Sequence, residues 1–268
     1  MIITLLTDFG LCDNFVGVMK GVILGINPKV NIIDITHTVM PQDVFQAAFL
    51  LESSYRYFPA GTIHLVIVDP GVGSERKAII AKTRRYYFIG PDNGVLSLAL
   101  KAEGEVVDVV SITNRKFFLK PVSRTFHGRD IFAPAAAYLS RGRGITEFGP
   151  LQKGYKSLKL PQPEIISPPA GKGKKILQGR IIYIDRFGNL ITNIREEFFR
   201  EFVGARKFRI YLKNKVIDRI SKSYMDPEKN KPLAIFGSFA NLEISVSRGS
   251  ARDYFGAKVG LKLSVEAQ

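Results

Sequence analysis

Residues 63–76 read IHLVIVDPGVGSER, and this stretch decides the fold. Apart from His64, its first six positions are apolar and mostly β-branched, and a run this short and continuous is typical of a strand buried on both faces. The run ends at Asp69-Pro70-Gly71, where proline cannot donate to a strand ladder and glycine allows a tight turn. The stretch therefore predicts a buried strand with a carboxylate at its C-terminal edge, where open α/β sheets bind ligands.

Arg76 follows Asp69 closely enough along the chain to fold back onto its carboxylate. In one interpretation the two side chains form part of a ligand site. In the other, Asp69 caps its own turn, as strand-end aspartates commonly do, and Arg76 is a solvated surface charge. The second interpretation is favoured on this stretch alone.

The N-terminus repeats the same device, because the apolar residues 2–6 lead into Thr7-Asp8-Phe9-Gly10. Strands alternate with helices of apolar residues at helical spacing from there to about residue 140. Strands are predicted at 2–6, 30–35, 63–68, 78–83, 86–89 and 106–112, and helices at 15–26, 44–57, 95–100 and 131–139. This alternation indicates an α/β fold with a largely parallel sheet and right-handed crossovers.

Residues 161–175 are rich in proline, glycine and lysine and are predicted to be a linker. After them the pattern changes from alternating strands and helices to mainly strands. Short strands then follow one another with a single helix, at 195–202. They are predicted at 179–184, 190–194, 207–212, 233–236, 242–246 and 261–265. Such a series suggests a small β-barrel or sandwich. We therefore expect an N-terminal α/β domain over 1–160 and a smaller C-terminal β-barrel domain over 176–268.

The composition sets outer limits on function. Of 268 residues, 46% are hydrophobic, which is enough for a core and excludes a disordered chain. The single cysteine, Cys12, excludes an internal disulfide and a multi-cysteine metal site. We find no signal peptide and no stretch long and apolar enough to span a bilayer, so we expect a cytoplasmic protein. The net charge of +15 is scattered and accompanies no nucleic-acid-binding motif, so nucleic acid is only a minor alternative partner.

The histidines and one polar turn are the remaining chemical candidates. His64 lies in the middle of a strand and is expected to be a satisfied core residue, whereas His37 ends a strand and fits either a structural or a functional role. His127 lies just before a predicted helix, and a histidine at such a position, taken alone, is slightly more often structural than catalytic. Residues 185–189, DRFGN, form a polar turn between two apolar strands that fits a plain hairpin, and its many side-chain donors and acceptors indicate a ligand contact only with low specificity. No GxGxxG, Walker A, HExxH or GxSxG motif is present.

The chain resembles the S-adenosylmethionine hydroxide adenosyltransferases, the water-using relatives of fluorinase and chlorinase, in five motifs. They are TDFG at 7–10, VDPGVGSER at 68–76, GPDNG at 90–94, TFHGRDIFAP at 125–134 and IDRFGNLITNI at 184–194. Each motif is modest alone, but five in order over nearly the whole chain are specific. The resemblance implies a homotrimer that holds each substrate between the N-domain of one subunit and the C-domain of its neighbour.

The reaction that the resemblance implies is attack of water on the ribose C5′ of S-adenosylmethionine, giving adenosine and methionine. The sulfonium departs as a neutral thioether, so no general acid is required, and neither a metal nor a cofactor is expected. The implied catalytic trio falls on Asp69, Arg76 and His127. Pairing with Arg76 would weaken Asp69 as a base, so we expect Arg76 to orient, and Asp69 and His127 to hold the water and share its proton. Asp8 matches the carboxylate that grips the ribose diol.

The second domain is implied to hold adenine and the methionine end of the substrate. The matching residues are Asp185, Asn189, Ser238 and Glu243. Asp185 and Asn189 lie one residue closer together than their counterparts in the halogenating relatives. Phe239 stands where those relatives carry an arginine, which argues against a carboxylate clamp at that position.

Three alternatives remain beside hydrolysis. The first is a halogenase, but the halogenating relatives carry a serine where Gly128 stands and lack the trio of Asp, Arg and His. The second is a module that binds S-adenosylmethionine or adenosine without turnover. The third is a basic nucleic-acid-binding protein, for which only the net charge speaks.

Overall fold

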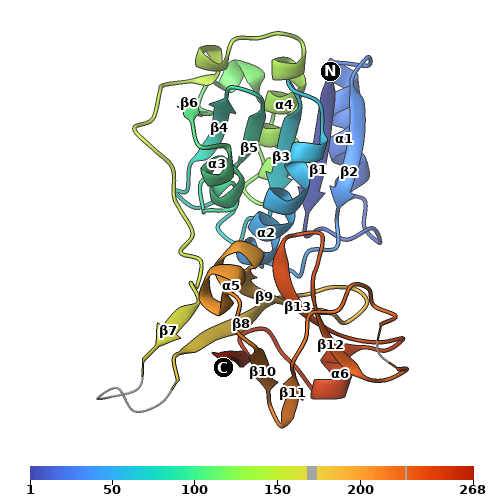
Figure 1. The fold of residues 1–268 in the computed structure, drawn as a ribbon. Coiled ribbons are helices and arrows are strands. Elements are labelled where there is room, and N and C mark those ends of the chain that lie inside the picture. The colour runs from blue at the N-terminus through green and yellow to red at the C-terminus, as the bar shows by residue number, and fades with distance from the viewer. Residues whose placement is uncertain (168–173, 227) are drawn as a thin grey trace. The chain divides into compact units, whose positions relative to one another are not determined.

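The computed structural model describes residues 1–167, 174–226 and 228–268. The chain divides into two units, Met1–Lys159 and Leu160–Gln268. The first unit alternates strands with helices, and the second consists mainly of strands, as the labelled ribbon in Figure 1 shows.

A six-stranded sheet in the order β2-β1-β3-β5-β4-β6 forms the centre of the first unit. Its strands are β1 (Ile2–Thr7), β2 (Asn31–Thr36), β3 (Ile63–Ile67), β4 (Ala78–Thr83), β5 (Tyr87–Pro91) and β6 (Val106–Ser111). β2, β1, β3 and β5 run parallel, whereas β4 is antiparallel to both β5 and β6. The predicted, largely parallel α/β sheet is thus confirmed.

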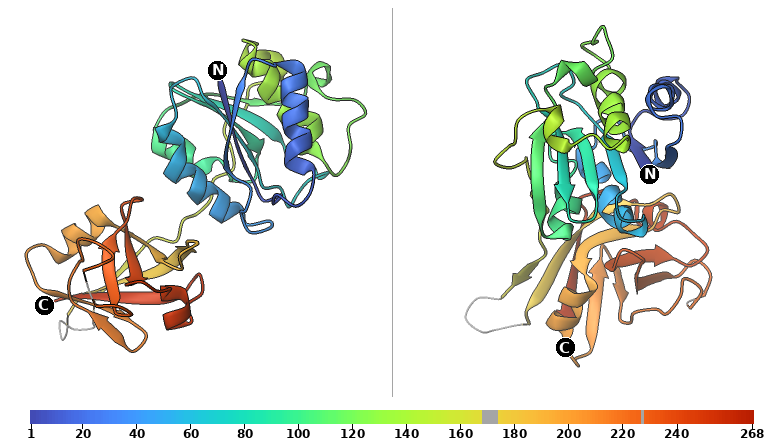
Figure 2. Two further views of the ribbon diagram at one scale, coloured as in Figure 1. Left: turned by 90° about the vertical axis from the view of Figure 1, so that its right-hand side faces the viewer. Right: turned by 90° about the horizontal axis from the view of Figure 1, so that it is seen from above.

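Helices cover both faces of this sheet. They are α1 (Phe15–Ile26), α2 (Val44–Ser54), α3 (Ser97–Glu103) and α4 (Ala133–Ser140). α1 packs beside α4 on one face, and α2 packs beside α3 on the other, which the left view of Figure 2 shows for α1 and α2.

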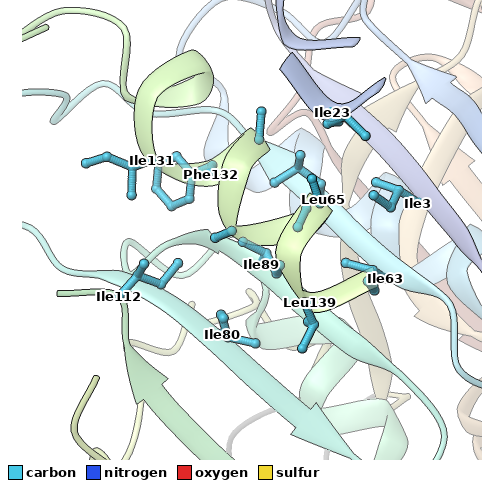
Figure 3. Close-up of a cluster of buried hydrophobic side chains, with 14 of the residues drawn as sticks. Ile3, Ile23, Ile63, Leu65, Ile80, Ile89, Ile112, Ile131, Phe132 and Leu139 are labelled. Carbon is cyan, nitrogen blue, oxygen red and sulfur yellow. The ribbon is translucent and has the colours of Figure 1, made fainter. Parts of the chain in front are cut away.

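The two faces explain why β3 is a continuous apolar run. Alternate side chains of a strand point to opposite faces. Leu65 and Ile67 therefore join the core under α1 and α4, part of which Figure 3 shows, while Val66 and Val68 join the core under α2 and α3. A strand covered on both sides has no polar face, so its sequence lacks the period of two.

Several predicted helices differ from the observed ones. The helix predicted over 95–100 is observed over Ser97–Glu103. The helix predicted over 44–57 ends as an α-helix at Ser54 and continues as a 3₁₀ turn over Tyr55–Tyr57. The helix predicted over 131–139 is preceded by a π-helical turn, Gly128–Phe132, so helical structure begins directly after His127. π-turns carry no periodic sequence signal and occur frequently at functional sites.

An eight-stranded antiparallel sheet forms the second unit, in the order β11-β10-β14-β8-β9-β13-β12, with β7 added beside β8. The elements are β7 (Glu164–Ile166), β8 (Ile176–Ile184), β9 (Leu190–Arg195), α5 (Glu196–Val203), β10 (Phe208–Leu212), β11 (Lys215–Ile217), β12 (Pro232–Phe236), β13 (Asn241–Val246), α6 (Ala251–Phe255) and β14 (Lys262–Ala267). A bridge between Ile220 and Ala234 links the segment after β11 to β12, so the sheet is nearly closed. The predicted barrel is confirmed in this form.

The short elements β7, β11 and α6 were not predicted, because three to five residues carry too little pattern. β7 lies inside the segment 161–175 that was predicted to be a linker, and it pairs with β8. Residues 168–173 of that segment lie outside the described residues. Within the described part of the chain, no helix has the length and apolar character needed to cross a membrane.

Candidate active site

Asp8 and Asp69 project from the ends of neighbouring strands. β1 and β3 are adjacent and parallel, with Thr7 opposite Ile67, so each carboxylate follows its strand by one or two residues. The chain runs from β1 to β2 on one side and then crosses to β3 on the other side. The space beyond these two strand ends is therefore the switch point of the sheet, where open α/β folds bind ligands.

Arg76 folds back onto Asp69 and also reaches His127. Its Nε donates to both Asp69 oxygens at 3.0 and 2.8 Å, and its Nη2 donates to Asp69 Oδ2 and to His127 Nδ1, the latter at 2.9 Å. The Arg76 and Asp69 side chains are only 7% and 5% exposed. The guanidinium also lies over the Phe132 ring, 5.2 Å from its centroid. The interpretation of Arg76 as a solvated surface charge is therefore wrong.

The hydrogen bond from Arg76 defines the state of the His127 ring. A guanidinium group can only donate, so Nδ1 accepts and the ring proton of neutral His127 lies on Nε2. Burial, followed by the positive charge of Arg76, lowers the pKa of His127, although the charges of Asp69 and Asp130 and a hydrogen bond to the Ser123 backbone act in the opposite direction. At neutral pH the ring is accordingly an uncharged donor through Nε2.

Asp130, which sequence reasoning did not select, shapes the loop before His127. Its carboxylate is wholly buried, accepts the Ser123 N–H at 2.7 Å and pairs with Arg129 Nε at 2.6 Å. The backbone carbonyl of Asp130 accepts the Leu119 N–H at 2.9 Å. Asp130 therefore anchors the irregular segment that delivers His127. The only signal in the sequence was its place beside His127 at a predicted helix start.

The Asp8 carboxylate accepts a hydrogen bond from the backbone of Gln42, another residue that sequence reasoning missed. The Gln42 N–H donates to Asp8 Oδ2 at 2.8 Å, and Gln42 adopts a left-handed backbone with φ of 67°. Non-glycine residues adopt this conformation uncommonly and at some cost. The strained loop thus orients one oxygen of the carboxylate.

A cavity of about 400 Å³ lies against these residues in the first unit. Its polar lining is Asp8, Gln42, Asp69, Thr125 and His127. Its apolar wall includes the rings of Phe9, Phe15 and Phe126, whose centroids lie 5.1–5.9 Å apart. Carboxylates beside an aromatic wall suit a ligand with hydroxyl groups and an apolar or cationic body.

Asp185 and Asn189 contact each other in the second unit, where they shape the turn between β8 and β9. Asp185 Oδ1 accepts the N–H groups of Phe187 and Asn189, both at 2.9 Å, and its Oδ2 accepts the Asn189 side chain at 2.8 Å. Gly188 has φ of +83°, and a Cβ there would lie 2.2 Å from Ser250 Oγ. The turn is therefore rigid, and Phe187 at its tip is 76% exposed.

Glu243 lies on β13 and is 5% exposed. Its Oε1 accepts the Tyr224 hydroxyl at 2.9 Å and the Ser245 hydroxyl at 2.8 Å. Burial is the main cause that raises the pKa of Glu243, and the negative charge of Asp185 acts in the same direction. The pKa of Tyr224 is raised to about 12 by burial and by its bond to Glu243, so Tyr224 remains a donor.

Ser238, the fourth residue selected in this unit, is exposed in the turn between β12 and β13. Asp185, Asn189 and Glu243 thus form one electrostatically linked group, and Ser238 is placed on a neighbouring turn. Tyr224 carried no signal in the sequence. A larger groove of about 800 Å³ in the same unit is lined by residues of α5 and β10 and contains none of the selected residues. The described residues include no cluster of three or more His, Cys, Asp or Glu able to hold a metal.

Comparisons with known proteins match both units. Residues 3–149 match the family model of the SAM hydroxide adenosyltransferase N-terminal domain, and residues 179–264 match that of its C-terminal domain. An (R)-S-adenosyl-L-methionine hydrolase of Salinispora tropica is 35% identical over 265 residues, covering 99% of this chain and 97% of that protein. A fluorinase of Nocardia brasiliensis is 25% identical over 99% of this chain and 96% of its own length. A crystal structure of an uncharacterized conserved protein from Thermotoga maritima matches with a TM-score of 0.88 and 37% identity, covering 99% of each chain.

Proposed function

The chain belongs to the SAM hydroxide adenosyltransferase family, and from this premise we propose that it hydrolyses S-adenosyl-L-methionine (SAM) to adenosine and L-methionine. One observation carries the proposal: Asp69, Arg76 and His127 form a single hydrogen-bonded cluster on the cavity that Asp8 also lines. The cluster combines an acceptor, an orienting cation and a neutral donor. These are the groups that are needed to hold one water molecule beside a ribose.

The proposed reaction is a single displacement at carbon. The water oxygen forms a bond to C5′ of the ribose while the bond from C5′ to sulfur breaks. The electron pair of that bond goes to the sulfonium, which leaves as the neutral thioether of methionine, and the water loses one proton. The site therefore has to align the water with the breaking bond and receive one proton late in the step.

Asp69 is the proposed acceptor of that proton, because a carboxylate only accepts hydrogen bonds. Arg76 fixes the plane of the carboxylate and is assigned an orienting role. His127 is assigned to the water oxygen as a donor through Nε2, since its Nδ1 already accepts from Arg76. The sequence led us to expect that His127 and Asp69 share the proton. Neutral His127 in this arrangement has no free lone pair, so the proton is assigned to Asp69 alone.

The substrate contacts are proposed residue by residue. Asp8 takes the two ribose hydroxyls, each through a charge-assisted hydrogen bond. In the second unit, Asn189 and Ser238 offer amide and hydroxyl groups to adenine or to the methionine end. Asp185 and Glu243 are neighbouring carboxylates, and they suit the ammonium group of methionine, which only donates.

Gly128 supports water rather than halide as the nucleophile. A Cβ at this buried position would lie 3.2 Å from Phe126 Cε2 and 3.3 Å from Met19 Sδ. Both distances are tighter than ordinary contacts, so the serine expected of a halogenating relative fits only if its neighbours shift. The halogenase is thus the less favoured enzyme.

Incubation with SAM in isotopically labelled water tests the proposal. Mass analysis should find the label in the 5′-hydroxyl of adenosine, and an Asp69→Ala preparation serves as the control for contaminating activity. Unlabelled adenosine, cleavage at another bond of the sulfonium, or binding without product would each overturn the proposal. Both sulfonium epimers should be supplied. In the name of the Salinispora tropica relative, L gives the configuration of the α-carbon of methionine, so (R) describes the configuration at the sulfonium sulfur.

We propose further that the enzyme is a homotrimer whose sites are completed by neighbouring subunits, on the strength of the sequence resemblance. The two groups of selected residues, one in each unit, are compatible with a site assembled from two halves. The proposed location is the cytoplasm, since a charged sulfonium metabolite does not cross a bilayer unaided.

A further inference from the structure

A chain of polar side chains lies directly behind Asp8 in the first unit. Thr7, the last residue of β1, places its Oγ1 2.8 Å from His37 Nδ1. His37 Nε2 lies 3.0 Å from Asp34 Oδ1, off the ideal hydrogen-bond line, and Lys20 of α1 donates to Asp34 Oδ2 at 2.6 Å. Thr7 is wholly buried and His37 is 3% exposed, whereas Asp34 reaches the surface.

The polar contacts from Asp34 through His37 to Thr7 have a single direction when the His37 ring is neutral. A carboxylate only accepts, so the proton of neutral His37 belongs on Nε2, facing Asp34. Nδ1 then accepts, and the Thr7 hydroxyl must donate to it. The Thr7 oxygen retains its lone pairs and accepts the Phe9 N–H at 3.3 Å. Each group thus determines the orientation of the next, from the surface to the loop that carries Asp8.

His37 forms hydrogen bonds with this loop on both sides of Asp8, to Thr7 and to Gly10. Its ring holds Thr7 just before Asp8, and its backbone carbonyl accepts the Gly10 N–H at 2.7 Å just after it. Gly10 has φ of 68°, which lets the chain turn back between these two contacts. The pairing of β1 with β2 shifts register by one residue between Leu5 and Leu6, so β2 is irregular between Asp34 and Thr36, just before His37.

We propose that Thr7, His37 and Asp34 are positioning residues that aim the Asp8 carboxylate at the ribose diol. The inference rests on the proposed function, because it takes Asp8 as the group that grips the diol. Gln42 orients one Asp8 oxygen from outside the strand, and the polar chain sets the backbone from inside it. None of the three residues lines the cavity, so we assign them no direct contact with the ligand.

Thr7→Val is the central variant, because it removes the hydroxyl and keeps the branched shape. We expect it to weaken adenosine binding about tenfold while the affinity for 2′-deoxyadenosine changes little, since the deoxy sugar lacks one hydroxyl that Asp8 takes. Thr7→Ser, which keeps the hydroxyl, should bind both nucleosides like the unaltered protein. In an Asp8→Ala background, Thr7→Val should cause no further loss of adenosine affinity.

The same strand offers a matched control. Thr4 is also wholly buried on β1, and its Oγ1 lies 2.8 Å from Nδ1 of another buried histidine, His64. Thr4→Val therefore removes an equivalent contact away from Asp8. It should lower the melting temperature as Thr7→Val does and leave the preference for adenosine over 2′-deoxyadenosine intact.

Equal losses for both nucleosides in Thr7→Val, or the same change of preference in Thr4→Val, would overturn the inference and leave a packing role only. If Thr7→Val does not fold, variants of the partly exposed Asp34, at the surface end of this network of polar side chains, provide the same comparison. Asp34→Ala should reduce the preference for adenosine, and Asp34→Asn, which keeps an acceptor, should retain it. Failure of the unaltered protein to bind adenosine would instead contradict the proposed function, on which the inference depends.

Discussion

Arg76 connects the two groups that are proposed to handle the water. One guanidinium donates to Asp69 and to His127, and it is almost fully buried among them. Its planar shape presents hydrogens in fixed directions, which a lysine ammonium does not reproduce. The orientation of both partners therefore depends on a single side chain.

Asp69→Ala should lower turnover by about a hundred- to ten-thousand-fold, the usual contribution of a group that accepts a proton in the reaction. His127→Ala should lower it by about a hundred- to a thousand-fold, the usual contribution of one positioned hydrogen-bond donor. Both should still bind adenosine, because the proposed grip on the ribose belongs to Asp8. Steady-state rates and calorimetric titration with adenosine measure the two effects separately. If both variants lost adenosine affinity in proportion to activity, the two residues would be binding groups, contrary to their proposed roles.

At the scale of elements, the π-turn that begins at Gly128 is packed tightly against α1. Gly128→Ser should lower the free energy of unfolding by about 1–3 kcal/mol, because Phe126 and Met19 must move to admit the new side chain. Urea denaturation measures this loss. Gly17→Ser is the matched control, since a Cβ at Gly17 on α1 meets nothing within 4 Å.

The Gly128→Ser variant also tests the choice of nucleophile. Supplied with SAM and chloride, it should still release adenosine and form no chlorinated nucleoside, because the cluster around Arg76 still holds water. A chlorinated product would show that this one position decides between water and halide. An unchanged free energy of unfolding would contradict the packing argument.

Strand β13 carries a buried carboxyl group, that of Glu243, whose contribution to the free energy of unfolding depends on pH. Burial raises the pKa of Glu243 above its ordinary value of 4.5, so the folded protein holds this proton to higher pH than the unfolded chain does. The associated stability is fully present below the unfolded pKa and is lost as pH rises through the folded pKa. Glu243→Gln, which stays neutral, should therefore melt a few degrees higher than the unaltered protein at neutral pH and at about the same temperature near pH 4.

Melting curves across this pH range measure the difference between the two proteins. Since Glu243 is also a proposed substrate contact, the stabilised variant should bind SAM more weakly, a common trade between stability and function. A difference in melting temperature that does not change with pH would show that Glu243 ionisation is not its cause.

For the whole molecule, the prediction concerns assembly. If each site draws on two neighbouring chains, inactive Asp69→Ala and inactive Asp185→Ala proteins should regain activity when their subunits exchange. In an equal, randomly mixed ring, about a quarter of the sites would combine two intact halves. Activity after exchange, compared with unexchanged mixtures and each variant alone, measures the recovery. A monomer by size measurement, or mixtures that stay inactive although folded and exchanged, would exclude shared sites.

The sequence by itself was enough for the fold class and for the positions of most elements. Apolar runs with β-branched residues, helical spacing and Gly or Pro at their ends are local properties, and local properties can be recognised directly in the sequence. The short strands β7 and β11 and the π-turn at Gly128 escaped because a few residues carry no period. Asp8, Asp69 and His127 were selected, but on these residues alone each could have been a structural residue.

Only the tertiary structure decided how these residues combine. Strand order placed β1 beside β3 and so brought Asp8 near Asp69, and the pairing of distant segments joined Arg76 to His127, Gln42 to Asp8 and Thr7 to His37. The direction of each of these hydrogen bonds then followed from which groups can only donate or only accept. Such contacts depend on strand register and backbone turns far apart in the chain, and no local pattern in the sequence encodes them.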